Sequence, residues 1–239
     1  MSSVWVDEPP GTLYPSGMTF SIVTGANRGV GLALVAELRR RGHTVLAACR
    51  KSSPELAKLG AEVVEGVDVS TDPGIAALVA AVGSRPIDLL VNNAGMAVWG
   101  DRLGELNVEG IRRQFEVNAL GPLRLTDALR DRLGKGAKVA LITSRMGSID
   151  DNSSGGGYGY RMSKAALNMA GKSLAVDLRG RGIAVAILHP GMVKTDMTGG
   201  HAGAVEPADS ARDLVARIDA LTLETSGGFW HANGERLPW

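Results

Sequence analysis

The sequence predicts an α/β fold in which a doubly wound parallel sheet of about seven strands carries helices on both faces. Two observations predict it. Short runs of apolar, often β-branched residues alternate along the chain with longer segments of helical periodicity. The short runs are apolar on both faces, which is typical of parallel strands covered by helices on either side. No internal repeat and no Pro- or Ser-rich linker divides the chain after position 18, so we expect one domain over residues 18–239.

The strands are expected near positions 21–24, 44–48, 61–64, 89–92, 138–142, 183–188 and 228–231. Helices are expected near 30–41, 74–82, 108–132, 160–179 and 207–221. Residues 1–17 differ from the rest, because they contain three prolines and two glycines and show no periodic apolar pattern. We interpret them as a loose extension ahead of the domain.

Composition argues against several classes of protein. The 239 residues carry a net charge of +1 and no run of Lys or Arg, so neither nucleic acid nor a membrane surface is expected as a partner. The apolar stretches are too short to span a bilayer, and the N-terminus lacks the pattern of a secretory signal. The single cysteine, Cys49, allows no internal disulfide, which favours a cytoplasmic location. The four histidines show no ligand spacing and predict no metal site.

A glycine-rich segment, TGANRGVG from Thr24 to Gly31, follows the first expected strand and opens the first expected helix. Glycines let a backbone turn sharply and approach a pyrophosphate, and a helix N-terminus offers free N–H groups. The spacing G-x3-G-x-G differs from the general G-x-G-x-x-G fingerprint, and an ordinary strand-to-helix turn is the alternative. The position after the first strand favours a dinucleotide site. Its candidate residues are Gly25, Asn27, Arg28, Gly29, Val30 and Gly31.

The residues after the second expected strand indicate which dinucleotide binds. An NAD-specific site usually carries an acidic residue there, which binds the ribose hydroxyl. Here the chain reads Cys49-Arg50-Lys51 without an acid, and Arg28 lies inside the glycine segment. Either arginine alone could be a solvated surface charge. Together they suit a 2′-phosphate, because guanidinium groups bind phosphate with two hydrogen bonds. The sequence therefore favours NADP(H) as the cofactor.

Residues after the third and fourth expected strands are candidates for the adenosine half of the cofactor. Asp68 could accept a hydrogen bond from the adenine amino group, with Val69 beside it, or could belong to a helix N-cap region. Asn93, Ala94 and Gly95 could line the cofactor or simply stabilise a turn.

Tyr160 and Lys164 lie four positions apart in a strongly helical segment, so their side chains share one face. Lowering the pKa of a tyrosine from about 10 to about 7 requires about 4 kcal/mol. An ammonium about 4 Å away supplies roughly that amount at an effective dielectric constant of about 20. The pair therefore predicts an acid–base catalyst, with a core tyrosine and a surface lysine as the common alternative. Tyr158 is less suitable, because it does not face Lys164.

Two polar residues are candidates for supporting roles. Ser144 follows the fifth expected strand, at the end of the sheet where α/β proteins bind ligands. Asn118 lies inside an expected helix, where asparagine is unfavourable. It could hold a water against Lys164, or it could mark a local kink. No G-x-S-x-G segment occurs, so a serine hydrolase is not predicted.

Taken in order, these motifs resemble the short-chain dehydrogenase/reductase family in its compact single-domain branch, from about residue 18 to the end. Pro190-Gly191 completes the set, and residues 189–197 and 234–239 are most similar to the C-factor and sniffer-type carbonyl reductases. The resemblance implies a Rossmann-type fold and an NADP(H)-dependent oxidoreductase that acts on a small carbonyl or alcohol substrate. It also implies a homo-oligomer.

The resemblance further implies a role for each site residue. Tyr160 would exchange the proton, Lys164 would bind the nicotinamide ribose and lower the tyrosine pKa, and Ser144 would orient the carbonyl. Asn118 would anchor a water. The chain departs from the family in one respect: sixteen positions separate Ser144 from Tyr160 instead of about a dozen, with the extra length in the flexible stretch 153–157. Ser148 is therefore an alternative to Ser144. The implied cofactor contacts are Asn93 on the adenosine side, Thr195 at the carboxamide, and Pro190, Gly191 and Val193 nearby.

Two other functions fit parts of the pattern. A signalling protein of the same fold could bind NADP(H) without turnover, but it would need neither Tyr160 nor Lys164 nor Asn118. A nucleotide-sugar epimerase would need room for a sugar-binding domain, and only about 48 residues follow Gly191. The sequence does not indicate the substrate.

Overall fold

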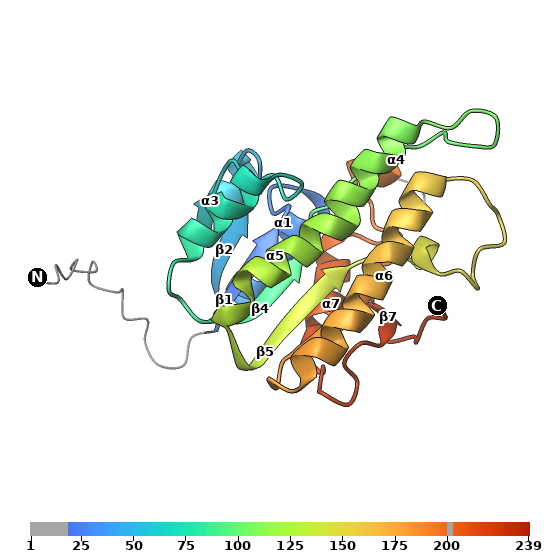
Figure 1. Ribbon diagram of the computed structural model, residues 1–239. Helices are drawn as coiled ribbons and strands as arrows, with labels where there is room; N and C mark the ends of the chain where they lie inside the picture. Colours follow the sequence, from blue (N-terminus) through green and yellow to red (C-terminus); the bar gives the residue numbers. More distant parts are fainter. Residues whose placement is uncertain (1–18, 200–202) are drawn as a thin grey trace, which may run out of the picture.

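The computed structural model describes residues 19–199 and 203–239. In this part of the chain, seven parallel strands form one sheet of order β3-β2-β1-β4-β5-β6-β7 (Figure 1). They are β1 (Phe20–Thr24), β2 (Thr44–Ala48), β3 (Glu62–Val64), β4 (Ile87–Asn92), β5 (Leu133–Ile142), β6 (Ala184–His189) and β7 (Phe229–His231). The predicted doubly wound α/β fold is confirmed. The expected extension over residues 1–17 lies outside the described residues, and the domain limits 18–239 stay a prediction.

Helices cover both faces of this sheet (Figure 1). On one face, α1 (Gly29–Arg40) packs beside α7 (Pro207–Asp219). The other face carries α3 (Asp72–Val82), α5 (Gly121–Leu129) and α6 (Tyr158–Arg179), with α4 (Val108–Phe115) alongside α6. A short helix that was not predicted, α2 (Pro54–Ala57), follows β2 and begins at the capping side chain of Ser53.

The two faces of the sheet bury two separate hydrophobic clusters. Adjacent strand residues point to opposite faces, so Ile22 belongs to one cluster and Val23 to the other. Leu34 of α1 packs into the cluster of Val23, whereas Leu125 of α5 packs into that of Ile22. Every strand between two helical layers must therefore be apolar on both sides, which is the pattern that predicted the fold.

The helix expected over 108–132 is interrupted. It ends as α4 at Phe115, passes through a π-helical turn η1 (Glu116–Leu120), continues as α5 and closes with a 3-10 turn η2 (Arg130–Arg132). Pro122 accounts for the change, because it has no N–H to donate to the carbonyl of Asn118 four residues earlier. Such turns are frequent at functional sites. β5 also differs from expectation, since it begins at Leu133 rather than near position 138.

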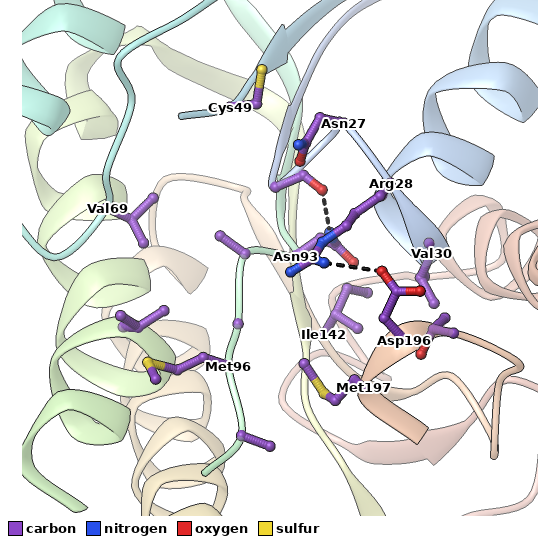
Figure 2. Close-up of a pocket in the computed structure, with 18 of the residues that line it drawn as sticks. Asn27, Arg28, Val30, Cys49, Val69, Asn93, Met96, Ile142, Asp196 and Met197 are labelled. Carbon is purple, nitrogen blue, oxygen red and sulfur yellow. Dashed lines mark hydrogen bonds and ion pairs between the residues drawn. The ribbon is translucent and has the colours of Figure 1, made fainter. Parts of the chain in front are cut away.

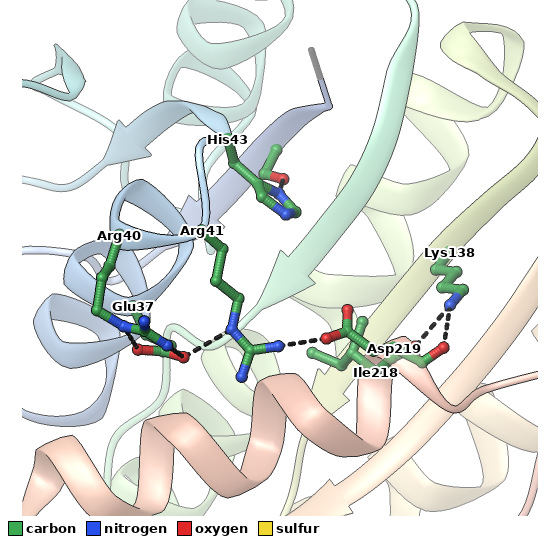
Figure 3. A network of polar contacts seen from close by, with 8 residues as sticks. Glu37, Arg40, Arg41, His43, Lys138, Ile218 and Asp219 are labelled. Atoms are coloured by element: carbon green, nitrogen blue, oxygen red, sulfur yellow. Dashed lines mark hydrogen bonds and ion pairs between the residues drawn. The ribbon is translucent and has the colours of Figure 1, made fainter. Parts of the chain in front are cut away.

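A charged network fastens α1 to α7 at the end of the sheet away from the glycine turn (Figure 3). The Arg41 guanidinium contacts Glu37 Oε1 at 2.6 Å and also the carboxylate of Asp219. Lys138 Nζ donates to the carbonyl oxygens of Ile218 at 2.7 Å and Asp219 at 2.9 Å. The network therefore joins the end of α1 to the end of α7, and the end of α7 to β5.

Glu37 gives this network a pH dependence. Hydrogen bonds from Arg40 foremost, and from Arg41, lower its pKa from 4.5 to about 2. A carboxylate with a depressed pKa stabilises the fold above its unfolded pKa, and this contribution is lost as pH falls through the folded pKa. We expect Glu37→Gln to lower the free energy of unfolding at pH 7 by about 1 kcal/mol. The deficit should shrink as pH falls from about 4.5 toward 2.

Denaturant titrations at pH 7, 4 and 3 measure this deficit, with Glu55→Gln as the control on an exposed carboxylate. An equal deficit of Glu37→Gln at all three pH values would show that the carboxylate charge is not its cause.

Candidate active site

A cleft of about 1040 Å³ opens where β1, β2, β4, β5 and β6 end (Figure 2). It lies beside the point where the strand order reverses between β1 and β4, which is where open α/β sheets bind ligands. The cleft brings most of the sequence-predicted residues together. Those that line it are Gly25, Asn27, Arg28, Gly29, Val30, Gly31, Arg50, Asp68, Val69, Asn93, Ala94, Gly95, Tyr160, Lys164, Pro190 and Thr195.

The glycine turn is packed too closely to carry side chains. Gly25 and Gly29 have φ angles of +65° and +54°, which L residues with a side chain rarely adopt. A Cβ on Gly31 would lie 2.1 Å from the carbonyl oxygen of Gly25, and a Cβ on Gly25 would lie 2.8 Å from Cα of Ala94. Helix α1 begins at Gly29, so its free N–H groups start here. A bare backbone cradle at a helix N-terminus fits a pyrophosphate.

Asn93 and Thr24 fasten this turn to the end of β4. Asn93 Nδ2 donates to the carbonyl oxygens of Thr24 at 3.0 Å and Gly25 at 3.3 Å. The Thr24 hydroxyl accepts hydrogen bonds from the N–H groups of Asn93 and Ala94, both at 3.0 Å. The Asn93 amide therefore shapes the cradle, and its expected contact with adenosine stays a prediction.

Both arginines predicted for the 2′-phosphate lie at the cleft and are exposed. Arg28 Nη1 contacts Asp196 Oδ2 at 3.0 Å, which joins the glycine turn to the segment after β6 (Figure 2). Arg50 lies near Asp68. The pKa of Asp68 is lowered chiefly because the Ser70 hydroxyl donates to its carboxylate at 2.6 Å, and the Arg50 charge adds to this effect. An ionised Asp68 is a hydrogen-bond acceptor only.

Tyr160 and Lys164 lie on one face of α6 and are 8% and 4% exposed. Lys164 Nζ donates to the carbonyl oxygen of Ile142 at 3.0 Å and lies 5.7 Å from the centroid of the Tyr160 ring. A Cβ on Gly95 would lie 3.6 Å from Lys164 Nζ, so the glycine keeps this side of the ammonium free. Both side chains therefore share the cleft with the glycine turn.

Burial decides the pKa values of this pair. It lowers the pKa of Lys164 from 10.5 to about 8. It also raises the pKa of Tyr160 above 10, although a hydrogen bond with the Ser144 hydroxyl acts in the opposite direction. The pKa of Tyr160 is therefore raised rather than lowered as expected, because desolvation of the phenolate outweighs the effect of the Ser144 hydroxyl. At neutral pH the phenol is protonated.

Ser144 and Asn118 adjoin the cleft without lining it. The Ser144 hydroxyl lies close enough to Tyr160 to affect its pKa, and it accepts from the N–H of Met146 at 3.1 Å. The long spacing to Tyr160 is taken up by Gly155, Gly156 and Gly157, whose φ angles are +62°, +61° and +56°. The alternative residue, Ser148, accepts a hydrogen bond from the N–H of Asp151 at 3.1 Å and so supports this loop.

Asn118 lies in the π-helical turn and is fully buried. Its Oδ1 accepts from the N–H of Met96 at 2.8 Å, and its Nδ2 donates to the Met96 carbonyl at 2.8 Å. Nδ2 also lies 2.9 Å from the Ser163 hydroxyl of α6. The amide therefore clamps the segment after Gly95 against α6. The water expected between Asn118 and Lys164 stays a prediction.

Gly191 and Val193 also lie outside the cleft lining. Gly191 has a φ angle of +87°, which forms the turn after Pro190. Val193 is 3% exposed, and its carbonyl accepts a hydrogen bond from the Thr198 hydroxyl at 2.6 Å. Both residues therefore shape the segment that carries Thr195 rather than face the cleft.

Several lining residues were missed by the sequence analysis. Most of them come from the segment after β4, from α4 and η1, and from the segment after β6. No motif marks them, and only the scarcity of aromatic residues, 4% of the chain, could have drawn attention to Trp99. Among the missed side chains are Met96, Trp99, Arg113, Glu116, Asp196 and Met197.

Within residues 19–199 and 203–239, no group of three or more His, Cys, Asp or Glu side chains could hold a metal ion. In the same residues, no helix is long and apolar enough to cross a membrane.

Comparison with known proteins identifies the family. The family model of the short chain dehydrogenases matches residues 20–204. The chain belongs to the short-chain dehydrogenase family. It is therefore an oxidoreductase of the dehydrogenase/reductase type, and the predicted family is confirmed.

Two relatives of this short-chain dehydrogenase carry different names, one that of an enzyme and one that of a signal. The chain is 43% identical over 227 residues to 1-hydroxy-2-glutathionyl-2-methyl-3-butene dehydrogenase of Rhodococcus sp., covering 93% of this chain and 100% of the relative. It is 48% identical over 160 residues to C-signal of Myxococcus xanthus, covering 66% of this chain and 96% of the relative.

Solved structures agree with this assignment. The NADPH-bound carbonyl reductase from chicken fatty liver matches with a TM-score of 0.86 and 29% identity, over 93% of this chain and 99% of that one. The carbonyl reductase Sniffer of D. melanogaster matches with a TM-score of 0.85 and 32% identity, over 93% and 100%.

Proposed function

We propose that the protein is an NADP(H)-dependent oxidoreductase that transfers a hydride between the nicotinamide and a small carbonyl or alcohol substrate. The observation that carries the proposal is the convergence of Tyr160, Lys164 and the glycine turn on one cleft. The cradle of Gly25, Gly29 and Gly31 would hold the pyrophosphate. When bound, the reduced nicotinamide supplies the hydride.

Arg28 and Arg50 support the choice of NADP(H), since both line the cleft beside the cradle and carry positive charge. The chicken fatty liver reductase, a structural neighbour, is NADPH-bound. Thr195, which lies on the segment after β6 and lines the same cleft, would contact the carboxamide.

The chain's own residues would transfer the proton. Tyr160 would donate its phenolic proton to the substrate oxygen as that oxygen becomes an alkoxide, and its raised pKa keeps the proton available at neutral pH. The Ser144 hydroxyl, which lies beside Tyr160, would orient the substrate oxygen. Lys164, with a pKa of about 8, is mostly an ammonium at pH 7 and would stabilise the phenolate that forms.

An absorbance screen of NADPH oxidation tests this function. Aldehydes, ketones and quinones are offered with NADPH, and the reverse arm offers alcohols with NADP⁺. We expect turnover with members of at least one class, abolished when the protein is omitted. NADPH binding without any turnover in either direction would contradict the proposed activity.

That contradicting result would favour a second candidate, a signalling protein that binds NADP(H) without useful turnover. One observation favours it: the relative named C-signal is 48% identical over 160 residues. Tyr160 and Lys164 argue for the enzyme, because binding alone requires no buried acid–base pair.

The arginines make a separate prediction about nucleotide choice. We expect the protein to bind NADPH more tightly than NADH. Arg50→Gln is expected to raise the dissociation constant of NADPH by roughly 10- to 100-fold and to change that of NADH little. The physical reason is the loss of a charge-assisted hydrogen bond that only the 2′-phosphate can make. Thermal shifts and dissociation constants at matched concentrations measure it, with Lys58→Gln as an exposed control outside the cleft. Equal affinities of the wild type for both nucleotides would contradict the arginine argument.

A further inference from the structure

Trp99 is the largest apolar side chain beside Tyr160 in the cleft. The centroids of the two rings lie 5.2 Å apart, with an angle of 54° between their planes. Trp99 nevertheless remains 51% exposed, whereas Tyr160 is 8% exposed. One part of the indole therefore covers the Tyr160 ring. The rest of the indole is a large apolar surface that is exposed at the cleft.

Two other segments of the chain adjoin the indole. Its Nε1–H donates to the carbonyl oxygen of Met197, in the segment after β6, at 3.4 Å. A Cβ on Gly157, at the start of α6, would lie 4.0 Å from the ring. Trp99 itself follows β4, so three separate segments meet at this side chain. A ring flanked in this way presents its exposed surface to the cleft.

Trp99 shares the cleft with other apolar and adaptable side chains. Met96 and Met197 line the cleft together with Trp99. Thioether side chains are polarizable and adjust to the shape of a neighbour. Charged side chains of both signs also line the cleft, among them Arg113 and Glu116. The three apolar side chains offer a bound group shape and apolar contact.

The position of Trp99 restricts the substrate. A carbonyl oxygen that receives the Tyr160 proton must lie within hydrogen-bond reach of the phenol. The group attached to the carbonyl carbon then lies among the surfaces around Tyr160, and the indole is the largest of them. Aromatic groups bind an aromatic surface more strongly than saturated groups of equal size, because their ring quadrupoles favour offset or edge-to-face contact.

We propose that Trp99 is a specificity-determining residue that forms an aromatic wall of the substrate pocket and selects planar, conjugated carbonyl compounds. This inference rests on the proposed function. We expect Trp99 to raise the preference for an aromatic over a saturated substrate by about tenfold, which is the upper end of what one ring contact contributes.

Two aldehydes with the same number of carbon atoms test it. Benzaldehyde is planar and aromatic, and cyclohexanecarboxaldehyde is saturated and puckered. The quantity measured is the ratio of their kcat/KM values with NADPH, so that intrinsic reactivity cancels when variants are compared. We expect Trp99→Leu to lower this ratio by about tenfold, mainly through KM, and Trp99→Phe to retain most of it. Trp239→Phe is the control, since Trp239 stacks on Phe229 away from the cleft lining.

A ratio in Trp99→Leu within about twofold of the wild type would overturn the proposal, as would an equal loss in Trp99→Phe. A binding arm separates this failure from that of the proposed function. Benzamide and cyclohexanecarboxamide, which are not reduced, are titrated into the NADP⁺-loaded protein. If the wild type shows no turnover, tighter binding of benzamide that Trp99→Leu abolishes would support the aromatic wall alone. Equal binding of the two amides would overturn it.

Discussion

Tyr160→Phe is expected to lower kcat by about 10³-fold and to leave the dissociation constant of NADPH within about twofold. The substitution removes only the hydroxyl that would donate the proton, and the ring remains packed beside Trp99. The backbone cradle for the pyrophosphate lies on other segments, so cofactor binding should persist. Steady-state kinetics on the best substrate of the screen and NADPH fluorescence titration measure the two quantities.

Tyr158→Phe is the matched control, because Tyr158 begins the same helix but does not line the cleft. It should retain nearly full kcat. Turnover of Tyr160→Phe close to the wild-type rate would remove the acid–base assignment, whatever the cofactor affinity.

Gly31→Ala is expected to lower NADPH affinity by at least about 100-fold and the free energy of unfolding by about 2–3 kcal/mol. The added Cβ would lie 2.1 Å from the carbonyl oxygen of Gly25 and 2.5 Å from Asn93 Nδ2. The first of these atoms belongs to the backbone of the turn and can move only if the cradle opens. The second belongs to the amide that fastens the turn to β4.

Calorimetric titration with NADPH and denaturant unfolding measure the two effects. Gly134→Ala is the control, because a Cβ there would meet nothing within 4 Å. Full NADPH affinity and unchanged stability of Gly31→Ala would mean that the close packing of the turn is not required.

The fold was largely predictable because its signals are local. Strands buried between two helical layers must be apolar on both faces, and all seven expected strands occur. The predicted boundaries of a helix were wrong where one residue changed the backbone hydrogen bonding. Pro122 interrupts the helix expected over 108–132, and the resulting π-helical turn has no periodicity that would reveal it.

The candidate site was predictable where its parts are neighbours in the chain. The turn from Gly25 to Gly31 and the pair Tyr160 and Lys164 are short motifs whose geometry follows from glycine freedom and from the helical repeat. Contacts between segments that are distant in the chain left no recognisable pattern in the sequence. Arg28 meets Asp196 across 168 positions, and Trp99 meets Tyr160 only because β4 and α6 reach the same cleft.

The sequence by itself determined the strands, the glycine turn and the shared helix face of Tyr160 and Lys164, because each depends on residues that are close together in the chain. Only the tertiary structure decided the protonation of that pair and the wall beside it. Burial raises the pKa of Tyr160 and lowers that of Lys164 to about 8, and burial is a property of the packed chain. A sequence pattern can place an ammonium near a phenol, but it does not specify how much water reaches either group.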